Sequence, residues 1–362
     1  MTADTIGGLW TFALVLCEAL CKSGTEVALV TMGRLPDAAK RAQAARIRNL
    51  SLISTDYRLE WTDDCARDVA ASQEFVLRLA EALRPDIVHA NTYCHAALPF
   101  GVPVLLTAHS CVATWWRACK NTPMPAQYLA YSTWIADAIS RADLLVAPTS
   151  AFLHEFRSVH GRARAQRVIR NGRAIPPCRT ATKEPVVLAA GRLWDEGKNI
   201  DVLCRAAQAG NLAIEIAGDN TSPDGRVAEF ENVTLLGRLG PDALLQRMAR
   251  AAVFAAPARY EPFGLSILEA ALSGCALVLG DIRTLRELWD GAAIFVPPDD
   301  AMAWRHALSG LIAEPARAAH AGMRAQAHAE RYSSEAMATG YLAAYAALLP
   351  HKQELPLAGV AA

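Results

Sequence analysis

The chain has 362 residues, of which 52% are apolar, and its 36 Lys and Arg residues balance 36 Asp and Glu residues. That length predicts two domains, and the apolar content is sufficient for two cores. The neutral charge balance argues against a nucleic-acid partner. The nine scattered cysteines include no Cys-x-x-Cys pair, which favours buried thiols in a reducing cytoplasm. No apolar run approaches the ~20 residues of a membrane span, so only peripheral contact with the inner membrane face fits the sequence.

In the first half of the chain, short apolar runs alternate with helical or turn-rich segments. Helical patterns are predicted at about residues 11–21 and at 65–83. The segment 35–57 shows no recognisable pattern. Strands are predicted at residues 26–32, 86–91, 102–109, 142–149 and 167–172.

A polar, proline-containing segment at residues 171–184 (NGRAIPPCRTATKE) separates this half from the next and is interpreted as a linker. Alternation then restarts. Strands are predicted at 185–192, 212–218, 232–237, 252–257, 276–281 and 293–297, and helices from 199, 242 and 264 and at 285–288. Three helical stretches follow over 301–349, and residues 350–362 are predicted to be disordered.

Strands that alternate with helices predict an α/β protein with parallel sheets and helices on both faces. Because the pattern occurs twice, we expect two doubly wound domains that face a central cleft, over residues 1–175 and 176–332. Ligands of such sheets bind at the carboxyl ends of the strands. The residues that follow strands are therefore the candidates for a functional site.

The loop after the first strand of the second half carries two cations. It reads GRLWDEGKN, and Arg192 and Lys198 precede the next helix. The planar fork of an arginine and the point charge of a lysine suit a diphosphate. The alternative is a solvated loop with incidental charge.

The stretch EPFGLSILEA at residues 261–270 places Glu261 before a helix and Glu269 within it. Gly264 allows close approach of a ligand, and the amides of residues 263–266 would be free donors for a phosphate. Glu269 is placed to accept hydrogen bonds from the two hydroxyls of a ribose, and Glu261 to reach a sugar joined to the diphosphate. The alternative is a helix-dipole glutamate and a surface glutamate, but the apolar neighbours of Glu269 make an unpaired charge there costly.

Two further features of the first half point to the cleft. Gly7 and Gly8 precede the first helix and allow close approach of a phosphate or an acceptor. His109 ends a predicted parallel strand and would face the cleft mouth; the alternative is a histidine satisfied in the core.

A metal site at His89, Cys94 and His95 is disfavoured, because the spacing matches no common site and no carboxylate joins them. Trp115 and Trp116 are interpreted as packing residues that lie near enough to His109 to line an acceptor pocket.

Together these motifs resemble the retaining glycosyltransferases of family 4, the group 1 or glycogen synthase-like enzymes of GT-B architecture. Asn171-Gly172, the LLGRL run at residues 235–239 and the final helix at 333–349 support the resemblance, which is strongest over 186–296. It implies two Rossmann-like domains and a C-terminal helix that crosses back to the first. It also implies transfer of a sugar from a nucleotide donor with retained configuration and without a required metal.

The resemblance implies a role for each matching position. Arg192 and Lys198 would hold the diphosphate, Glu261 the donor sugar and Glu269 the ribose, and His109 would lie beside the reacting carbon. Four of these form the catalytic set: His109, Glu261, Arg192 and Lys198. The implied binding set is Gly7 and Gly8 at the phosphate, Arg238 and Leu239 at the base, Phe263, Gly264, Leu265 and Ser266 at the phosphate, and Glu269 at the ribose.

Two segments depart from the family pattern. Only the short run MTAD stands where a full first strand is usual, and the region that is usually PNG reads RNGR here. Acceptor recognition in the family belongs to the N-terminal domain, which carries the weaker match.

The expected reaction moves a hexose from a UDP-sugar, in preference to a GDP-sugar, to a hydroxyl of a saccharide, a lipid-linked acceptor or a small molecule. Three alternatives remain. A phosphorylase would need a lysine for pyridoxal phosphate, and Lys198 already has a role. A nucleotide-sugar epimerase shares the scaffold, and a non-catalytic nucleotide- or carbohydrate-binding protein would bind the donor without consuming it.

Overall fold

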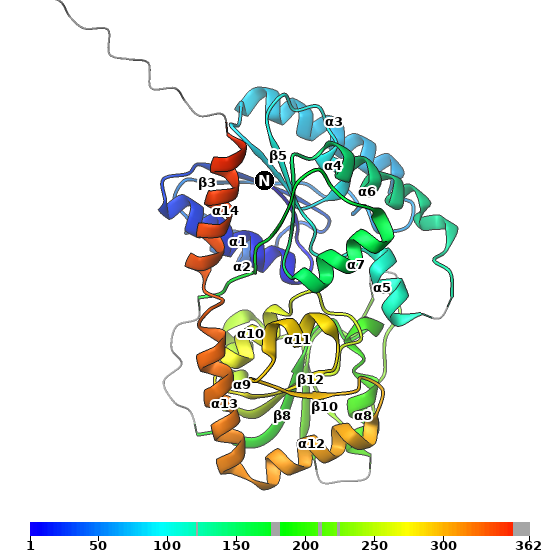
Figure 1. Ribbon diagram of the computed structural model, residues 1–362, viewed down its shortest axis with the longest axis vertical. Helices are drawn as coiled ribbons and strands as arrows, with labels where there is room; N and C mark the ends of the chain where they lie inside the picture. The colour runs from blue at the N-terminus through cyan, green and yellow to red at the C-terminus, as the bar shows by residue number, and fades with distance from the viewer. Residues whose placement is uncertain (121, 175–181, 209–211, 223–224, 350–362) are drawn as a thin grey trace, which may run out of the picture.

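The computed structural model describes residues 1–120, 122–174, 182–208, 212–222 and 225–349. Two α/β lobes lie one beyond the other along the long axis of the molecule (Figure 1). Every pairing between named strands is parallel, as the alternating pattern predicts. The predicted disordered tail at 350–362 and half of the predicted linker, residues 175–181, lie outside the described residues.

The first lobe contains two hydrogen-bonded groups of strands, in the orders β1-β2-β3 and β4-β5-β6-β7. The strands are β1 Thr2–Asp4, β2 Val27–Met32, β3 Leu50–Ser54, β4 Val88–Ala90, β5 Val104–Thr107, β6 Leu144–Ala147 and β7 Gln166–Val168. The helices are α1 Gly8–Lys22, α2 Ala38–Ala45, α3 Ala66–Leu83, α4 Tyr93–Ala96, α5 Val112–Cys119, η1 Ala126–Tyr128, α6 Leu129–Arg141 and α7 Ser150–His160.

The first strand is present but short, and it joins the two groups through side chains. Strand β1 pairs with β2 along its three residues. On its other side, the Asn91 amide nitrogen after β4 donates to Thr2 Oγ1 at 3.0 Å, and Asn91 Nδ2 donates to the Thr2 carbonyl at 2.8 Å. Asn91 therefore links β4 to β1, where no backbone ladder joins them within the described residues.

The segment 35–57, which has no pattern in the sequence, forms α2 and β3. Strand β3 lies at the edge of its group, and none of its five residues is fully buried. A half-exposed edge strand lacks the apolar run or strict alternation by which a strand is identified in a sequence.

The second lobe contains one parallel sheet in the order β10-β9-β8-β11-β12-β13, the doubly wound Rossmann order. Its strands are β8 Glu184–Ala190, β9 Ile214–Ala217, β10 Thr234–Gly237, β11 Ala251–Ala256, β12 Ala276–Gly280 and β13 Ile294–Val296. The helices after β7 are η2 Glu196–Lys198, α8 Asp201–Ala207, α9 Pro241–Arg250, α10 Leu265–Leu272, α11 Arg283–Trp289, α12 Ala301–Ala313, α13 Pro315–Ala329 and α14 Ser334–Leu348.

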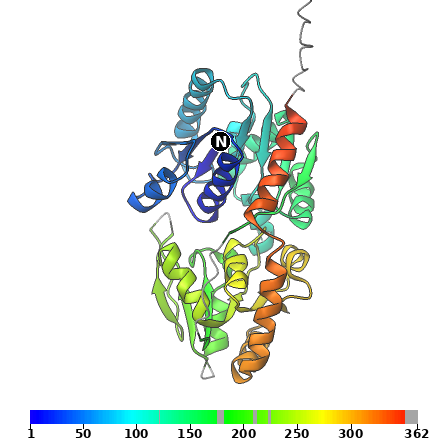
Figure 2. The ribbon, with the colours of Figure 1, turned by 90° about the vertical axis from the view of Figure 1, so that its left-hand side faces the viewer.

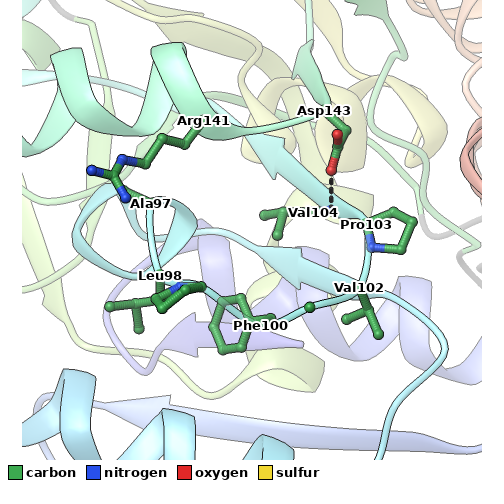
Figure 3. Close-up of a pocket in the computed structure, with 10 residues that line it drawn as sticks. Ala97, Leu98, Phe100, Val102, Pro103, Val104, Arg141 and Asp143 are labelled. Carbon is green, nitrogen blue, oxygen red and sulfur yellow. Dashed lines mark hydrogen bonds between the residues drawn. The ribbon is translucent and has the colours of Figure 1, made fainter.

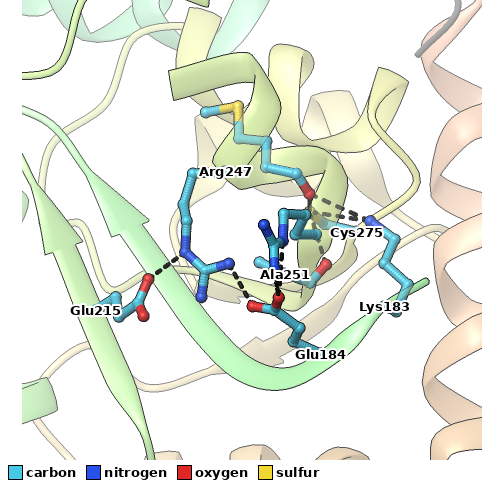
Figure 4. Close-up of polar contacts among 8 residues, drawn as sticks. Lys183, Glu184, Glu215, Arg247, Ala251 and Cys275 are labelled. Carbon is cyan, nitrogen blue, oxygen red and sulfur yellow. Dashed lines mark hydrogen bonds and ion pairs between the residues drawn. The ribbon is translucent and has the colours of Figure 1, made fainter. Parts of the chain in front are cut away.

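A group of ion pairs fastens α9 to the amino-terminal side of this sheet (Figure 4). The Arg247 guanidinium pairs with Glu184 at 2.5 Å and also with Glu215 of β9. Nearby, Lys183 Nζ donates to the Ser273 carbonyl at 2.9 Å. Ligands of parallel sheets bind at the opposite ends of the strands, so we assign this group a structural role.

The last helix returns to the first lobe, as the resemblance implies. Helix α14 lies beside α1 in both views (Figures 1 and 2). Its Tyr345 hydroxyl lies 2.7 Å from His89 Nδ1, and its Tyr341 hydroxyl lies 3.1 Å from Thr107 Oγ1. The chain therefore crosses between the lobes twice, before β8 and before α14.

The two crossings touch at a glycine. A Cβ atom on Gly172 would lie 2.0 Å from the carbonyl oxygen of Ser333, a main-chain atom that has little room to move. Only glycine allows the two crossings to lie this close.

We predict that Gly172→Ala lowers the free energy of unfolding by about 1–3 kcal/mol, the usual cost of overpacking. Urea unfolding followed by circular dichroism measures it. The matched control is Gly310→Ala in α12, where a Cβ meets only Arg317 at 3.7 Å and helix propensity should add about 0.5–1 kcal/mol. Equal stability of Gly172→Ala and the parent protein would contradict the contact.

Candidate functional site in the cleft between the lobes

Two loops of the second lobe are joined through the main chain at Gly197. The amides of Arg259 and Tyr260 both donate to the Gly197 carbonyl, at 2.9 and 3.3 Å. One loop follows β8 and the other follows β11, and these strands are neighbours in the sheet. The joined loops therefore present their side chains at the same place on the carboxyl edge.

This junction brings together two of the predicted catalytic residues. Lys198 Nζ forms an ion pair with the Glu261 carboxylate, and the two side chains are only 21% and 12% exposed. Gly191 lies beside the lysine, because a Cβ there would lie 3.6 Å from its side chain. A lysine held at this depth interacts with an anion more strongly than one in bulk water.

Arg192 is held by a buried carboxylate that the sequence analysis did not single out. Its guanidinium pairs with Asp195 at 2.7 Å. Asp195 also accepts hydrogen bonds from the Gly197 amide at 2.9 Å and from Trp115 Nε1 of the first lobe at 2.8 Å. Burial alone would raise the pKa of Asp195, but Arg192, Lys198 and the Trp115 bond outweigh it, so the pKa is lowered and the group stays ionised.

Helix α10 begins in the cleft with free amides. Gly264 adopts φ 86°, a left-handed conformation that glycine accepts without strain. In the described part of the chain the amides of Leu265 and Ser266 have no acceptor, so they are available to an anion.

The glycine pair of the first lobe faces these groups. A Cβ on Gly7 would lie 3.7 Å from the Arg192 guanidinium, and one on Gly8 would lie 3.5 Å from the Leu265 side chain. The cleft is therefore bounded on one side by the start of α1. On the other side it is bounded by the start of α10 and by the loop at residues 191–199, which carries Arg192 and Lys198 and is called the basic loop below.

His109 follows β5 and is neutral. Its Nε2 lies 2.7 Å from Asn91 Oδ1, and since Asn91 Nδ2 donates to Thr2, the proton is assigned to Nε2. Burial lowers the pKa of His109 to about 3, and its ring lies edge-on to Phe12. The Nδ1 lone pair accepts no bond from a described residue.

Glu269 lies in α10 and is also paired. Its Oε1 accepts a hydrogen bond of 2.7 Å from Arg173 Nε, and the two side chains are 12% and 19% exposed. Burial raises the pKa of Glu269, and the Arg173 charge opposes that shift. An unpaired carboxylate would be costly to bury among the apolar neighbours of Glu269, and the ion pair with Arg173 relieves that cost.

Arg238 and Leu239 follow β10, at the edge of the sheet; Arg238 is exposed and Leu239 is half-buried. Arg238 faces α2 of the first lobe. Burial lowers the pKa of Lys40, and the charge of Arg238 lowers it further. Lys40 donates to the Thr5 carbonyl at 2.6 Å, so its ammonium is hydrogen-bonded to the loop that carries the glycine pair.

A tyrosine of the second lobe contacts the first lobe, and the sequence did not predict this contact. Tyr260 belongs to the second lobe but packs in the core of the first. Its hydroxyl lies 2.8 Å from Thr114 Oγ1 and accepts from the Cys111 amide at 3.2 Å. On the same side, Glu287 of α11 accepts from both amides at the start of α7. No local pattern distinguishes these residues from ordinary core and surface positions.

Two hollows lie at different ends of the strands. One of about 270 Å³ lies between the lobes and is lined by residues that include Glu155, Glu261 and Arg283. The other, of about 390 Å³, lies at the amino ends of β5 and β6 (Figure 3), where Asp143 accepts from the Val104 amide at 2.8 Å. Only the first adjoins the candidate site.

Among the described residues, no group of three or more His, Cys, Asp or Glu side chains is arranged so that it could hold a metal ion. The ring nitrogens of His89 and His95 lie within hydrogen-bond distance of hydroxyls: Thr107, Tyr345, Ser72 and Thr92.

Among the helices described, none combines the length and apolar character of a membrane span.

Asp4, at the carboxyl end of β1, adds a titratable group beside the cleft. Burial raises its pKa from 3.8 to about 6, although the Ile6 amide and the charges of Arg192 and Lys40 oppose the shift. The folded protein therefore binds more protons than the unfolded chain between about pH 4 and 6. The contribution of Asp4 to the free energy of unfolding should fall as pH rises through that window.

We predict that Asp4→Asn removes this loss, so that the variant melts above the parent protein at pH 8 and the difference disappears below pH 4. Melting temperatures across pH 3–8 measure it. Asp37→Asn is the control of opposite sign, because the Lys40 amide bond lowers the pKa of Asp37 and its charge stabilises the fold at high pH. A gain at pH 8 in both variants, or in neither, would refute the assignment.

Comparison with known proteins identifies the family. Residues 6–174 match the model of Glycosyltransferase Family 4, and residues 184–314 match that of Glycosyl transferases group 1. Among curated proteins, the chain is 27% identical over 277 residues to a glycogen synthase of Mycobacterium tuberculosis, covering 70% of this chain and 65% of that protein's length. It is 26% identical to a D-inositol 3-phosphate glycosyltransferase of Nocardia farcinica, over 95% of this chain and 85% of that one.

Solved structures share the fold. Sucrose-phosphate synthase from Thermosynechococcus elongatus has a TM-score of 0.76 at 19% identity, covering 96% of this chain and 95% of that one. Anabaena HepE, solved in complex with UDP-glucose, has a TM-score of 0.75 at 19% identity, covering 96% and 98%. With a GT-B fold and a family match in each lobe, the chain belongs to the family 4, group 1 glycosyltransferases.

Proposed function

We propose that this protein is a retaining, metal-independent hexosyltransferase. It takes the hexose from a nucleotide-diphosphate sugar, UDP in preference to GDP. The acceptor is a hydroxyl of a saccharide, a lipid-linked acceptor or a small molecule. The observation that carries the proposal is the meeting of Arg192, Lys198 and the free amides of α10 opposite Gly7 and Gly8. The complex of HepE with UDP-glucose supports the choice of donor.

The diphosphate occupies the space between the basic loop and the start of α10. Negative charge develops on it as the bond between sugar and phosphate breaks. Lys198, Arg192 and the amides of Leu265 and Ser266 stabilise that charge with groups already in position. Because these groups are partly withdrawn from water, their electrostatic contribution exceeds that of the same charges on an open surface.

The anomeric configuration is retained because the acceptor hydroxyl attacks the anomeric carbon on the same face from which the diphosphate departs. The bond from the acceptor oxygen to the anomeric carbon forms as the bond from that carbon to the phosphate oxygen breaks. The departing phosphate oxygen takes the proton of the acceptor hydroxyl. Glu261 is committed to Lys198, so it suits binding of the sugar hydroxyls better than nucleophilic attack.

His109 contributes as a neutral group. With its proton on Nε2 and a pKa near 3, it neither carries charge nor donates a proton at physiological pH. Its Nδ1, which accepts no bond from a described residue, would accept a hydrogen bond from a hydroxyl of the donor sugar near the reacting carbon. The reaction would take place in the cytoplasm, and peripheral membrane contact would give access to a lipid-linked acceptor.

A nucleotide screen tests the donor. We expect UDP to raise the melting temperature more than GDP or ADP, and the matching UDP-sugar to release UDP slowly by hydrolysis. Thermal-shift measurements followed by assay of the released nucleotide check this. Stabilisation by a nucleotide without release from any UDP- or GDP-hexose would favour the binding-protein alternative, and a product that is an epimerised donor would favour the epimerase.

Lys198→Ala tests the diphosphate role. Loss of one charge-assisted contact, worth about 1.5–3 kcal/mol, together with an unpaired Glu261, should lower donor turnover by at least about tenfold. Lys22→Ala is the control, because its ammonium is exposed and its ion pair among the described residues is with Glu18, away from the cleft residues. Circular dichroism confirms folding of both variants. Turnover of Lys198→Ala within a few-fold of the parent protein would exclude the assigned role.

A further inference from the structure

The two chain crossings meet at Arg173 as well as at Gly172. The Arg173 amide donates to the Tyr332 carbonyl at 3.0 Å, and Gly172 lies against Ser333. The backbone of Arg173 is therefore fixed where both connections between the lobes pass each other.

The side chain of Arg173 reaches from this crossing into the cleft. Its Nε donates to Glu269 Oε1 at 2.7 Å. Oε2 of the same carboxylate accepts no bond from any residue that the structure describes. Glu269 lies one turn into α10, the helix whose free amides face the diphosphate site, and its side chain is 12% exposed.

The other crossing contacts the turn before α10. The Tyr332 ring lies edge-on to Phe263, with centroids 5.8 Å apart, and its hydroxyl donates to the Leu288 carbonyl at 2.8 Å. Phe263 directly precedes Gly264. Both ends of the nucleotide site, the turn and the carboxylate, are thus held by residues of the crossings.

We propose that Arg173 is a positioning residue for nucleotide binding: it takes one oxygen of Glu269 and leaves the other directed at the ribose hydroxyls of the donor. A carboxylate that is free to rotate would lose rotamer entropy on binding the ribose. A carboxylate already fixed by a planar guanidinium does not. This inference rests on the proposed ribose role of Glu269.

The rival explanation is that the pair only neutralises a buried charge. Removing one partner of such a pair is destabilising whatever the function, so a loss of stability does not separate the two explanations. Discrimination between a ribose and a 2′-deoxyribose does, because a purely structural pair has no reason to change it.

The experiment is calorimetric titration with UDP and with 2′-deoxy-UDP. The proteins are the parent chain, Arg173→Gln, Glu269→Gln, the double variant, and Arg331→Gln as an exposed control on the other crossing. We expect Arg173→Gln to weaken UDP binding at least tenfold. We also expect it to abolish the preference for UDP, so that the dissociation constants of UDP and 2′-deoxy-UDP differ by less than twofold. The double variant should bind within twofold of Glu269→Gln, because both changes act on the same contact. Arg331→Gln should match the parent.

The outcomes distinguish the proposed role of Glu269 from the proposed role of Arg173. If Glu269→Gln keeps the parental preference for the ribose, the proposed role of Glu269 fails, and the inference with it. If Glu269→Gln loses the preference while Arg173→Gln keeps it, or if the two losses add, only the inference fails. Should Arg173→Gln not fold, Arg173→Lys replaces it. Lysine retains the charge but lacks the planar fork, so a preference equal to that of the parent overturns the proposal and a reduced one supports it.

Discussion

The site depends on one main-chain junction, where the Gly197 carbonyl accepts the amides of Arg259 and Tyr260. It joins the loop after β8 to the loop after β11. This connection brings Lys198 and Glu261 close enough to form an ion pair. A Cβ at position 197 would lie 2.9 Å from Trp115 Nε1, so a larger residue would have to displace the Trp115 side chain. The same junction directs Tyr260 into the core of the first lobe. The cleft chemistry and the attachment of the lobes therefore share one origin.

Three cations beside the cleft have carboxylate partners: Lys198 with Glu261, Arg192 with Asp195, and Arg173 with Glu269. Partly buried charges must be paired, because desolvation of an isolated one is too costly. The pairing also fixes where each cation lies before any ligand enters. An incoming diphosphate then meets groups that need little reorganisation, the condition under which electrostatic stabilisation is most effective.

The contacts between the lobes differ in kind from those of the site. Tyr260 contributes burial and hydrogen bonds, while Glu287 accepts the amides at the start of α7, where the helix dipole favours a negative charge. Asp195 belongs to both sets, because it binds Arg192 in its own lobe and Trp115 in the other. A movement of one lobe relative to the other would therefore change the position of Asp195 and, through it, of Arg192 in the basic loop.

The sequence by itself determined the repeated α/β alternation and the parallel sheets. It also identified the loops after β8 and β11 as carriers of the cations and glutamates, because apolar runs, glycines and charges leave local patterns. Only the tertiary structure decided the partners: Asp195 for Arg192, Trp115 for Asp195, Arg173 for Glu269, and the first lobe for Tyr260. The edge strand β3 and the Asn91 link to β1 were also invisible in the sequence. Apart from the i,i+3 pair of Arg192 and Asp195, these contacts join residues at least 80 positions apart, or depend on an exposed edge. Their geometry is fixed by how the sheets and crossings pack, and no neighbouring residue records it.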